Sequence, residues 1–323
     1  MMKAIVLSHY GKTDSLSLVE KAIPQPKEGE VLVKVHATSV NDFDWQIMCG
    51  KPFITRLVSG ILKPNIDVLG TEIAGTVESV GPGVSSFAVG DRVFGDVSDA
   101  GFGGFAEYAS VSQTALHNMP DLMTFQQAVS LPHASLLAWQ GLVDLGNIKQ
   151  GESVLINGAG GGVGVFALHI AKEFGCEVTG VDHALKLDFM KGLGFDHVID
   201  YQKTDFTAEA TRYDLILDVK TQHFPTRYLN VLNEGGRHIT CGGNTSSMIQ
   251  IALLGHLIGK VTGKRLSVIM LQPNQGLEHI NKMFESGTLK THIDGPFSFE
   301  DIPREMARFG RGEHIGKIVI NVV

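Results

Sequence analysis

The sequence contains few cysteines and no excess of basic side chains. Its three cysteines, Cys49, Cys176 and Cys241, are scattered and odd in number, which argues against a disulfide framework and favours a reducing compartment. The 323 residues include 27 basic and 34 acidic side chains, for a formal net charge of −7. Nucleic acids and anionic membranes, which attract basic proteins, are therefore not expected as main partners.

The sequence also lacks a long apolar run and a secretory leader. Its most apolar later stretch, residues 248–258, is interrupted by Gln250, Gly255 and His256 and is too short to cross a bilayer. From Met1 the chain goes directly into a strand-like pattern. A cytoplasmic location without a membrane partner is expected.

Glycine, by contrast, is plentiful, and its densest cluster joins a strand-like stretch to a helix-like one. Residues 153–157 favour a strand, and residues 165–174 carry apolar side chains at helical spacing. Glycines in such a turn let the backbone approach a pyrophosphate, whose charge faces the free N–H groups of the helix. A merely flexible loop would leave this direct junction unexplained. The residues predicted to bind the pyrophosphate are Ala159, Gly160, Gly161, Gly162, Val163 and Gly164.

An acidic residue ends the next predicted strand. Residues 177–181 favour a strand, and Asp182 follows it about 20 residues after the glycines. A carboxylate at this position binds the adenosine ribose of a dinucleotide. Nucleotide binding is therefore favoured over a purely structural turn.

The pattern of elements predicts two kinds of domain. Up to about residue 123, short β-prone stretches alternate with Gly and Pro turns. A helix is predicted over residues 125–145, and strands then alternate with helices, which implies a doubly wound parallel sheet. The early strands are predicted at residues 3–8, 30–37, 73–80 and 91–94. The later ones are predicted at residues 153–157, 177–181, 197–199, 213–219, 237–241 and 266–271.

The C-terminal part has its own pattern. Helices are predicted at residues 277–285 and near 301–309, and a strand at 317–322. This strand has no place in the six-stranded sheet, so we expect it to return to the first domain. The predicted domains are 1–123, 124–275 and a returning segment, 276–323.

Six short motifs resemble those of the medium-chain dehydrogenase/reductase superfamily along essentially the whole chain. They are Gly70-Thr71-Glu72-Ile73-Ala74-Gly75, Val89-Gly90-Asp91-Arg92-Val93, Gly104-Phe105-Ala106-Glu107-Tyr108, residues 157–164, Gly235-Gly236-Arg237 and Gly316-Lys317-Ile318-Val319. Their order and spacing together make the resemblance specific. It implies an α/β protein with a GroES-like β-rich N-terminal domain and a Rossmann domain.

The zinc ligands of the alcohol dehydrogenases in this superfamily are missing here. The matching positions are Asn41 and Thr71, and neither side chain suits zinc, which binds Cys, His and carboxylates. No cysteine lies between Cys49 and Cys176 to form a structural zinc lobe. The chain therefore resembles the zinc-independent quinone oxidoreductases. This implies hydride transfer from NAD(P)H to a quinone or an α,β-unsaturated carbonyl, bound in the cleft between the domains.

The same resemblance points to three candidate catalytic residues. Asn41 can donate a hydrogen bond to a carbonyl oxygen, although a turn or cap residue is an equally good interpretation. Asp44 lies near the cleft floor, where a structural role is favoured. Some relatives have a tyrosine nearby, but this chain has Trp45 and Gln46, so water is one candidate proton source. His133, in the predicted hinge, is another, although a hydrogen-bonded hinge residue is favoured.

The cofactor prediction balances two signals. Asp182 favours NADH, because a carboxylate binds a free ribose hydroxyl and repels a 2′-phosphate. Lys186 and Tyr201 lie where NADPH-dependent relatives bind the phosphate, and His183 can add to that cradle. As ordinary alternatives, Lys186 is a solvated helix residue and Tyr201 a loop aromatic. NADPH is the expected cofactor, with NADH as the alternative.

A second glycine pair follows the fifth predicted strand of this domain. Cys241, Gly242 and Gly243 are expected to pass along the nicotinamide, because glycine permits close backbone approach. Cys241 itself is more typical of a small packing residue than of a nucleophile.

Two other functions and one assembly remain open from the sequence. A nucleotide-binding regulatory or scaffold protein can keep this fold without turnover. An alcohol dehydrogenase that has lost its zinc is less favoured. Residues 266–271 form an apolar strand expected at the sheet edge, and such edges are usually covered or paired. A homodimer joined through these edges is therefore predicted.

Overall fold

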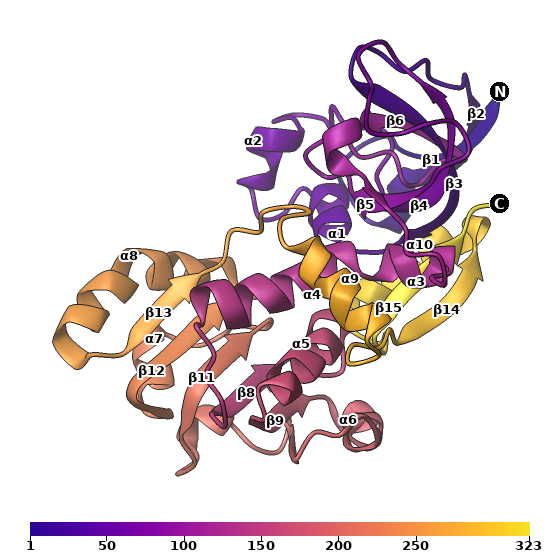
Figure 1. The fold of residues 1–323 in the computed structure, drawn as a ribbon. Helices are drawn as coiled ribbons and strands as arrows, with labels where there is room; N and C mark the ends of the chain where they lie inside the picture. The colour runs from indigo at the N-terminus through magenta and orange to yellow at the C-terminus, as the bar shows by residue number, and fades with distance from the viewer. The chain divides into compact units, whose positions relative to one another are not determined.

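The computed structural model describes residues 1–323, which fold into two compact units (Figure 1). The first unit comprises Met1–His133, Pro273–Gln275 and Ile293–Val323. The second comprises Ala134–Gln272 and Gly276–His292. The chain thus leaves the first unit and later returns to it. The predicted domain limits at 123/124 and 275/276 stay a prediction.

The second unit contains a six-stranded sheet in the order β10-β9-β8-β11-β12-β13. Every neighbouring pair is parallel, and the order 3-2-1-4-5-6 within the sheet is that of a doubly wound Rossmann fold. The predicted fold class is confirmed. The strands are β8 (Ser153–Asn157), β9 (Glu177–Asp182), β10 (His197–Asp200), β11 (Tyr213–Asp218), β12 (Leu232–Thr240) and β13 (Arg265–Val268).

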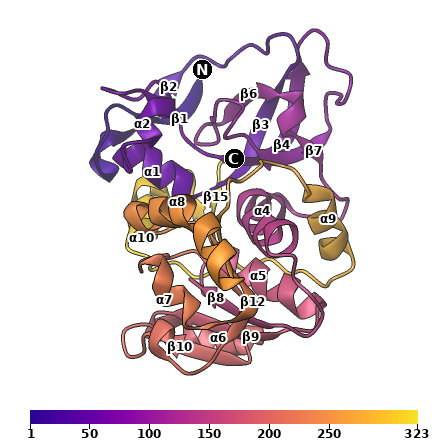
Figure 2. The same ribbon diagram turned by 90° about the vertical axis from the view of Figure 1, so that its left-hand side faces the viewer.

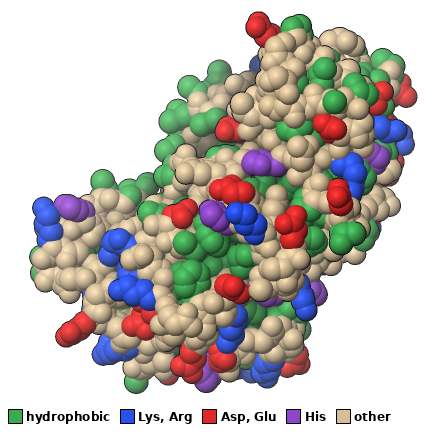
Figure 3. All heavy atoms as spheres, in the orientation of Figure 1, with side chains coloured by type: hydrophobic (Ala, Val, Ile, Leu, Met, Phe, Trp, Pro, Cys, Tyr) green, Lys and Arg blue, Asp and Glu red, His purple; other side chains and the backbone are tan.

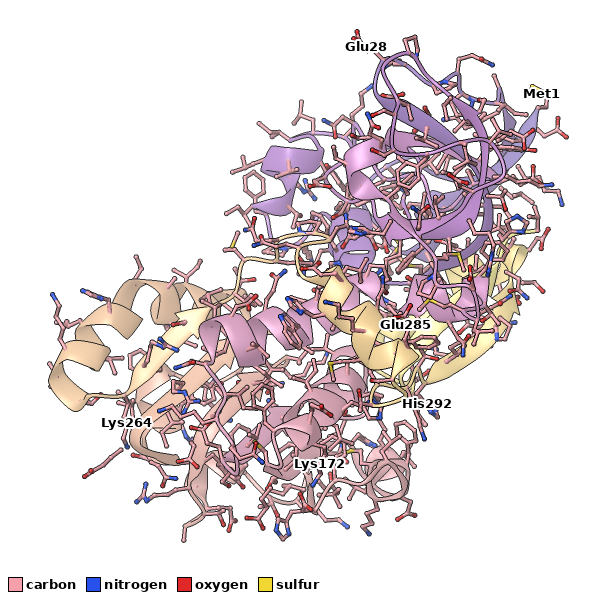
Figure 4. The ribbon with its side chains drawn as sticks, in the orientation of Figure 1. Met1, Glu28, Lys172, Lys264, Glu285 and His292 are labelled. Carbon is pink, nitrogen blue, oxygen red and sulfur yellow. The ribbon has the colours of Figure 1, made fainter.

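Helices cover both faces of this sheet. Figure 2 shows α7 and α8 on one side of the strands and α4 and α5 on the other. Their bounds are α4 (Pro132–Trp139), a π-helical turn η3 (Gln140–Leu145), α5 (Gly162–Glu173), η4 (Ala184–Lys186), α6 (Leu187–Leu193), η5 (Phe206–Ala208), α7 (Pro225–Leu229), α8 (Thr245–Thr262) and α9 (Leu277–Glu285). Lys264, labelled in Figure 4, donates to the carbonyl oxygens of Leu229 and Leu232 and so ties the turn before β13 to the end of α7.

The single helix predicted over residues 125–145 is wrong in detail. The structure has α3 (Phe125–Ser130), then α4 from Pro132, then η3. Proline has no N–H to continue the first helix and restricts the residue before it, but it suits the first position of a new helix. The chain therefore breaks at Leu131. Helix α8 was not predicted at all.

The first unit is built on a mixed seven-stranded sheet in the order β14-β15-β3-β4-β5-β7, with β6 paired to β3 and a separate β1-β2 pair. The strands are β1 (Met2–Leu7), β2 (Leu16–Lys21), β3 (Glu30–Ser39), β4 (Glu72–Val80), β5 (Arg92–Asp96), β6 (Tyr108–Ser112), β7 (His117–Asn118), β14 (Ile293–Ser298) and β15 (Lys317–Asn321). The helical segments are η1 (Thr13–Ser15), α1 (Asp42–Cys49), α2 (Thr55–Ser59), η2 (Gln113–Ala115), α3, η6 (Phe299–Asp301) and α10 (Ile302–Gly310).

The last strand lies inside this sheet. β15 pairs antiparallel with β3 and parallel with β14, and in Figure 1 the yellow C-terminal strands lie beside the indigo and purple ones. As a result, residues from both ends of the sequence share one core, in which Ile5, Ile47 and Phe105 pack with Ile318 and Ile320. None of the helices combines the length and apolar character that a membrane crossing needs.

Candidate functional site

The glycine-rich loop joins β8 to α5 in the second unit, as predicted. Gly158 has a φ of +88°, a conformation that favours glycine. A side chain at Gly164 would place its Cβ 2.4 Å from the carbonyl oxygen of Ala159. Helix α5 begins at Gly162, and no side chain caps it. Its first N–H groups, which have no partner within a helix, are thus available to an anion.

Asp182 at the end of β9 holds this loop in place. Its carboxylate accepts the N–H of Gly160 at 2.8 Å and that of His183 at 2.7 Å. The Lys186 ammonium lies 3.6 Å from the same carboxylate, and both side chains are buried. The charge of Asp182 is therefore largely compensated within the protein.

The structure brings the predicted adenosine-end residues together. The rings of His183 and Tyr201 meet edge to face with centroids 6.0 Å apart, and the N–H of Tyr201 donates to the carbonyl oxygen of Asp182. Lys186 packs so closely on the loop that a Cβ at Gly160 would come 2.7 Å from its Cδ. Tyr201 is half exposed. The glycine-rich loop and the Lys186 ammonium fit the phosphate groups of a dinucleotide, and the exposed ring of Tyr201 fits its base.

The segment Cys241–Gly243 follows β12 at the same carboxyl edge of the sheet. The N–H of Cys241 donates to the carbonyl oxygen of Asp218, and the N–H of Thr221 to that of Gly242. Gly243 has a φ of +121°, and a Cβ there would lie 2.3 Å from the carbonyl oxygen of Thr221. The backbone of this segment lies so close to the loop after β11 that a side chain at position 243 would not fit, which explains why this position is a glycine.

A buried charged cluster in the first unit surrounds the carboxylate of Glu72. The Lys317 ammonium lies 2.6 Å from its Oε2, and the amide nitrogen of Asn41 donates to the same oxygen at 2.7 Å. Lys317 also donates to the amide oxygen of Asn41, and the amide nitrogen donates to the hydroxyl of Thr71. The amide of Asn41 is thus oriented and its two N–H groups are bound within the protein. Donation from Asn41 to a substrate carbonyl stays a prediction, which this geometry does not favour.

The carboxylate of Asp44 binds the backbone and side chains next to this cluster. Its carboxylate accepts the N–H of Gly70 at 2.9 Å, the N–H of Asn41 at 3.1 Å and the hydroxyl of Thr71 at 3.1 Å. Complete burial raises the pKa of Asp44 to about 7, against the lowering effect of these donors and of His133. With every partner a protein donor, the geometry fits the structural role expected for Asp44.

His133 forms a buried pair with Asp96, at the end of β5. Its Nδ1 lies 2.7 Å from Asp96 Oδ2, and its backbone N–H donates to Glu72 Oε1 at 2.7 Å. Burial alone would lower the pKa of His133, but the hydrogen bond and charge of Asp96 and the charge of Glu72 raise it above the usual value. Burial would raise the pKa of Asp96, yet the bond to His133 brings it below its usual value. Because Asp96 takes Nδ1, the other ring nitrogen, Nε2, is the one that can exchange a proton with a ligand.

Three members of this cluster were not predicted from the sequence: Glu72, Asp96 and Lys317. Each is a charged residue at one end of a strand, and each is nearly inaccessible to water. A charge in such a strand is rarely buried without a partner. This rule could have marked the three residues as candidates for buried ion pairs, although it does not say which charges pair with each other.

Two family models match the chain. Residues 27–121 match the alcohol dehydrogenase GroES-like domain, and residues 193–320 match the zinc-binding dehydrogenase family. A quinone-oxidoreductase homolog of the chloroplast from Spinacia oleracea is 33% identical over 334 residues, covering 99% of this chain and 98% of that protein. An NADPH-dependent alkenal/one oxidoreductase from Arabidopsis thaliana is 30% identical over 99% of this chain and 79% of that protein.

A solved structure is similar over the full length. The quinone oxidoreductase from Coxiella burnetii superposes with a TM-score of 0.88 and is 28% identical, covering 100% of this chain and 99% of that one.

The residues of this chain do not fit the zinc that the name of one family model implies. Around Asn41 the side-chain groups are amide and hydroxyl groups and the carboxylates of Glu72 and Asp44. The Glu72 carboxylate is already paired with the Lys317 ammonium, and the Asp44 carboxylate already accepts hydrogen bonds from Gly70 and Thr71. No group of three His, Cys, Asp or Glu side chains is arranged to hold a metal ion. Zinc sites in proteins take their ligands from thiolate, imidazole and carboxylate groups. In this cluster the imidazole of His133 is bonded to Asp96 and the carboxylate of Glu72 to Lys317, while Asn41 and Thr71 offer no such ligand.

Proposed function

Because the chain belongs to the medium-chain dehydrogenase/reductase superfamily, in its quinone oxidoreductase-like family, we propose that it reduces quinones or α,β-unsaturated carbonyl compounds with NAD(P)H. The glycine-rich loop carries this proposal: an uncapped helix end, a backbone that tolerates no side chain at Gly164, and His183, Lys186 and Tyr201 beside it. When bound, the reduced nicotinamide supplies the hydride. The full-length similarity to named reductases favours an enzyme over a scaffold without turnover.

NADPH is the proposed cofactor, with NADH as the alternative. The Lys186 ammonium and two backbone N–H groups face the carboxylate of Asp182. Since its charge is compensated, Asp182 repels a 2′-phosphate less than a free carboxylate would. Lys186, His183 and the half-exposed Tyr201 are the groups that would bind that phosphate.

We assign the proton step to His133. Hydride addition turns a quinone into a hydroquinone anion, which needs one proton to become the neutral product. Protonated His133 can donate that proton from Nε2 while Asp96 holds Nδ1 and stabilises the charged ring. Asp96 is then a positioning residue, and neither step calls on a metal. Zinc independence is accordingly part of the proposal.

The first experiment is to follow the absorbance of NADPH and of NADH with purified protein, each with and without a small benzoquinone or an enone. We expect enzyme-dependent oxidation that requires the acceptor and is faster with NADPH. Faster oxidation of NADH would instead favour the ribose-binding role of Asp182. Binding of cofactor without acceptor-dependent oxidation would contradict the proposal and favour a scaffold. Reduction of NAD(P)⁺ by ethanol would favour an alcohol dehydrogenase.

A homodimer joined through β13 is also proposed. This strand lies at the edge of its sheet with β12 as its single neighbour, and an uncovered edge invites pairing with another strand. Light scattering should give twice the 34.9 kDa mass of the chain. A monomer at the same concentration would contradict the prediction.

A further inference from the structure

Helix α2 and the residues around it show an inverted pattern of burial. Within the helix the buried side chains are the hydroxyls of Thr55 and Ser59. The exposed ones are apolar, and with their neighbours they form what we call the α2 patch. Its members, all more than half exposed, are Phe53, Ile54, Leu57, Val58, Ile61 and Leu62. In Figure 3, green side chains gather at the upper left, where α2 lies in Figure 1.

The polar underside fixes this orientation. Ser59 Oγ and Tyr10 Oη lie 2.9 Å apart, and the Tyr10 hydroxyl also donates to the carbonyl oxygen of Gly60 at 2.5 Å. Arg56 donates to the carbonyl oxygen of Gly50 at 3.0 Å and stacks over the Tyr10 ring. Turning the patch inward would break these bonds. They therefore hold its apolar side chains exposed to solvent in the free protein. Such concentrated exposure of large apolar side chains marks a binding surface.

The charge around the patch is opposite to that of the whole protein. Lys51 and Lys63 are exposed at its two ends, and Arg56 is half-buried between them. No acidic residue lies between Asp44 and Asp67. This stretch thus carries three basic side chains in a chain whose net charge is −7. Apolar side chains framed by lysine are typical of segments that bind in the headgroup region of anionic membranes.

We propose that the α2 patch docks on the surface of a lipid bilayer that contains anionic headgroups. The apolar side chains enter the boundary between headgroups and acyl chains, while Lys51 and Lys63 contact lipid phosphates. In a symmetric dimer the patch would face its own copy and bring basic side chains against basic ones, and the apolar tail of a small molecule carries no charge to match the frame. The basic frame therefore favours an anionic bilayer as the occupant. The proposal departs from the expectation of no membrane partner, which rested on the net charge of the whole chain and on the lack of a membrane-spanning apolar run. It is independent of the proposed activity.

Sedimentation of the full-length protein with vesicles tests this. We expect binding to phosphatidylcholine vesicles that contain phosphatidylglycerol, weaker binding to phosphatidylcholine alone, and release at high salt. The double variant Val58→Glu/Leu62→Glu should bind about tenfold less or weaker still, because it removes apolar area and adds repulsion. The matched control, Val89→Glu/Leu122→Glu, changes the same residue types at positions whose exposure differs by no more than three percentage points, 67% and 95% against 66% and 92%. It should bind like the wild type.

A second pair of variants tests the basic frame. Lys51→Glu/Lys63→Glu should abolish the preference for anionic vesicles, whereas Lys12→Glu/Lys27→Glu, two exposed lysines elsewhere in the first unit, should preserve it. Thermal unfolding of each variant checks the fold. The proposal is overturned if the wild type does not bind anionic vesicles, or if test and control variants lose binding equally. It is also overturned if Val58→Glu/Leu62→Glu halves the mass in light scattering, since a second copy would then cover the patch.

Discussion

Replacement of His133 by glutamine is expected to lower kcat for quinone reduction by about 10²- to 10⁴-fold, the range that a positioned proton donor supplies. Glutamine can keep the hydrogen bond to Asp96 but has no proton to deliver near neutral pH. Stopped-flow or steady-state kinetics with NADPH and a benzoquinone would measure the loss. His9→Gln, which changes an exposed histidine of the same unit, is the control and should behave like the wild type.

The pH dependence of kcat distinguishes proton donation from a structural role. His133 donates in its protonated form, so kcat should be constant at low pH and fall as the pH rises through the raised pKa of His133. Asp96→Asn removes the charge that raises this pKa, so the fall should move to lower pH. His133→Gln should lack this titration altogether. A His133→Gln variant with wild-type kcat and an unchanged pH profile would show that water protonates the product.

Replacement of Lys317 by methionine is expected to lower the free energy of unfolding by about 3 to 5 kcal/mol, because it leaves the carboxylate of Glu72 buried without its cation. Glu72 is completely buried and the Lys317 side chain is 5% exposed. Urea denaturation would measure the change. The double variant Glu72→Gln/Lys317→Met removes both charges and should recover most of the loss.

An exposed ion pair gives the contrast. Lys3 and Glu300 lie 3.3 Å apart with more than half of each side chain exposed. Lys3→Met should therefore change the free energy of unfolding by less than about 1 kcal/mol. If Lys317→Met were equally mild, the Glu72 carboxyl would have to be neutral or solvated in the folded protein.

The second unit was predictable from the sequence because its signals are local. The apolar residues 154–156 of β8 lie just before the glycine cluster, with Asn157 between them and Gly158, and Asp182 ends β9 at the predicted position. Helix α8 was missed although its ends are clear in retrospect, with Asn244 accepting N–H groups at its start and Gly263 in the left-handed conformation at its end. Its apolar residues were weighed only as a possible membrane span. Local sequence thus predicted the strands and the glycine loop of this unit, but helix α8 was missed although its end signals are also local.

The charged cluster of the first unit was not predictable in the same way. Lys317 reaches Asn41 only because β15 pairs with β3 in one register, with Val319 opposite Ser39. Neighbouring residues in the sequence carry no trace of that register. His133 was singled out from its own segment, but its partner Asp96 comes from another strand. Long-range pairing decides such sites, and a single sequence does not show it.

The place of β15 also bears on how the chain is made. Lys317 leaves the ribosome 276 residues after Asn41, whereas the six strands of the second unit lie in one continuous stretch, 153–268. The second sheet can therefore form while synthesis continues, but the first lacks a strand and the cation of its buried cluster until residues 317–321 have emerged. Domains usually complete folding from the N-terminus during translation. Here most of the first unit emerges before the second unit, but the first unit is completed after it.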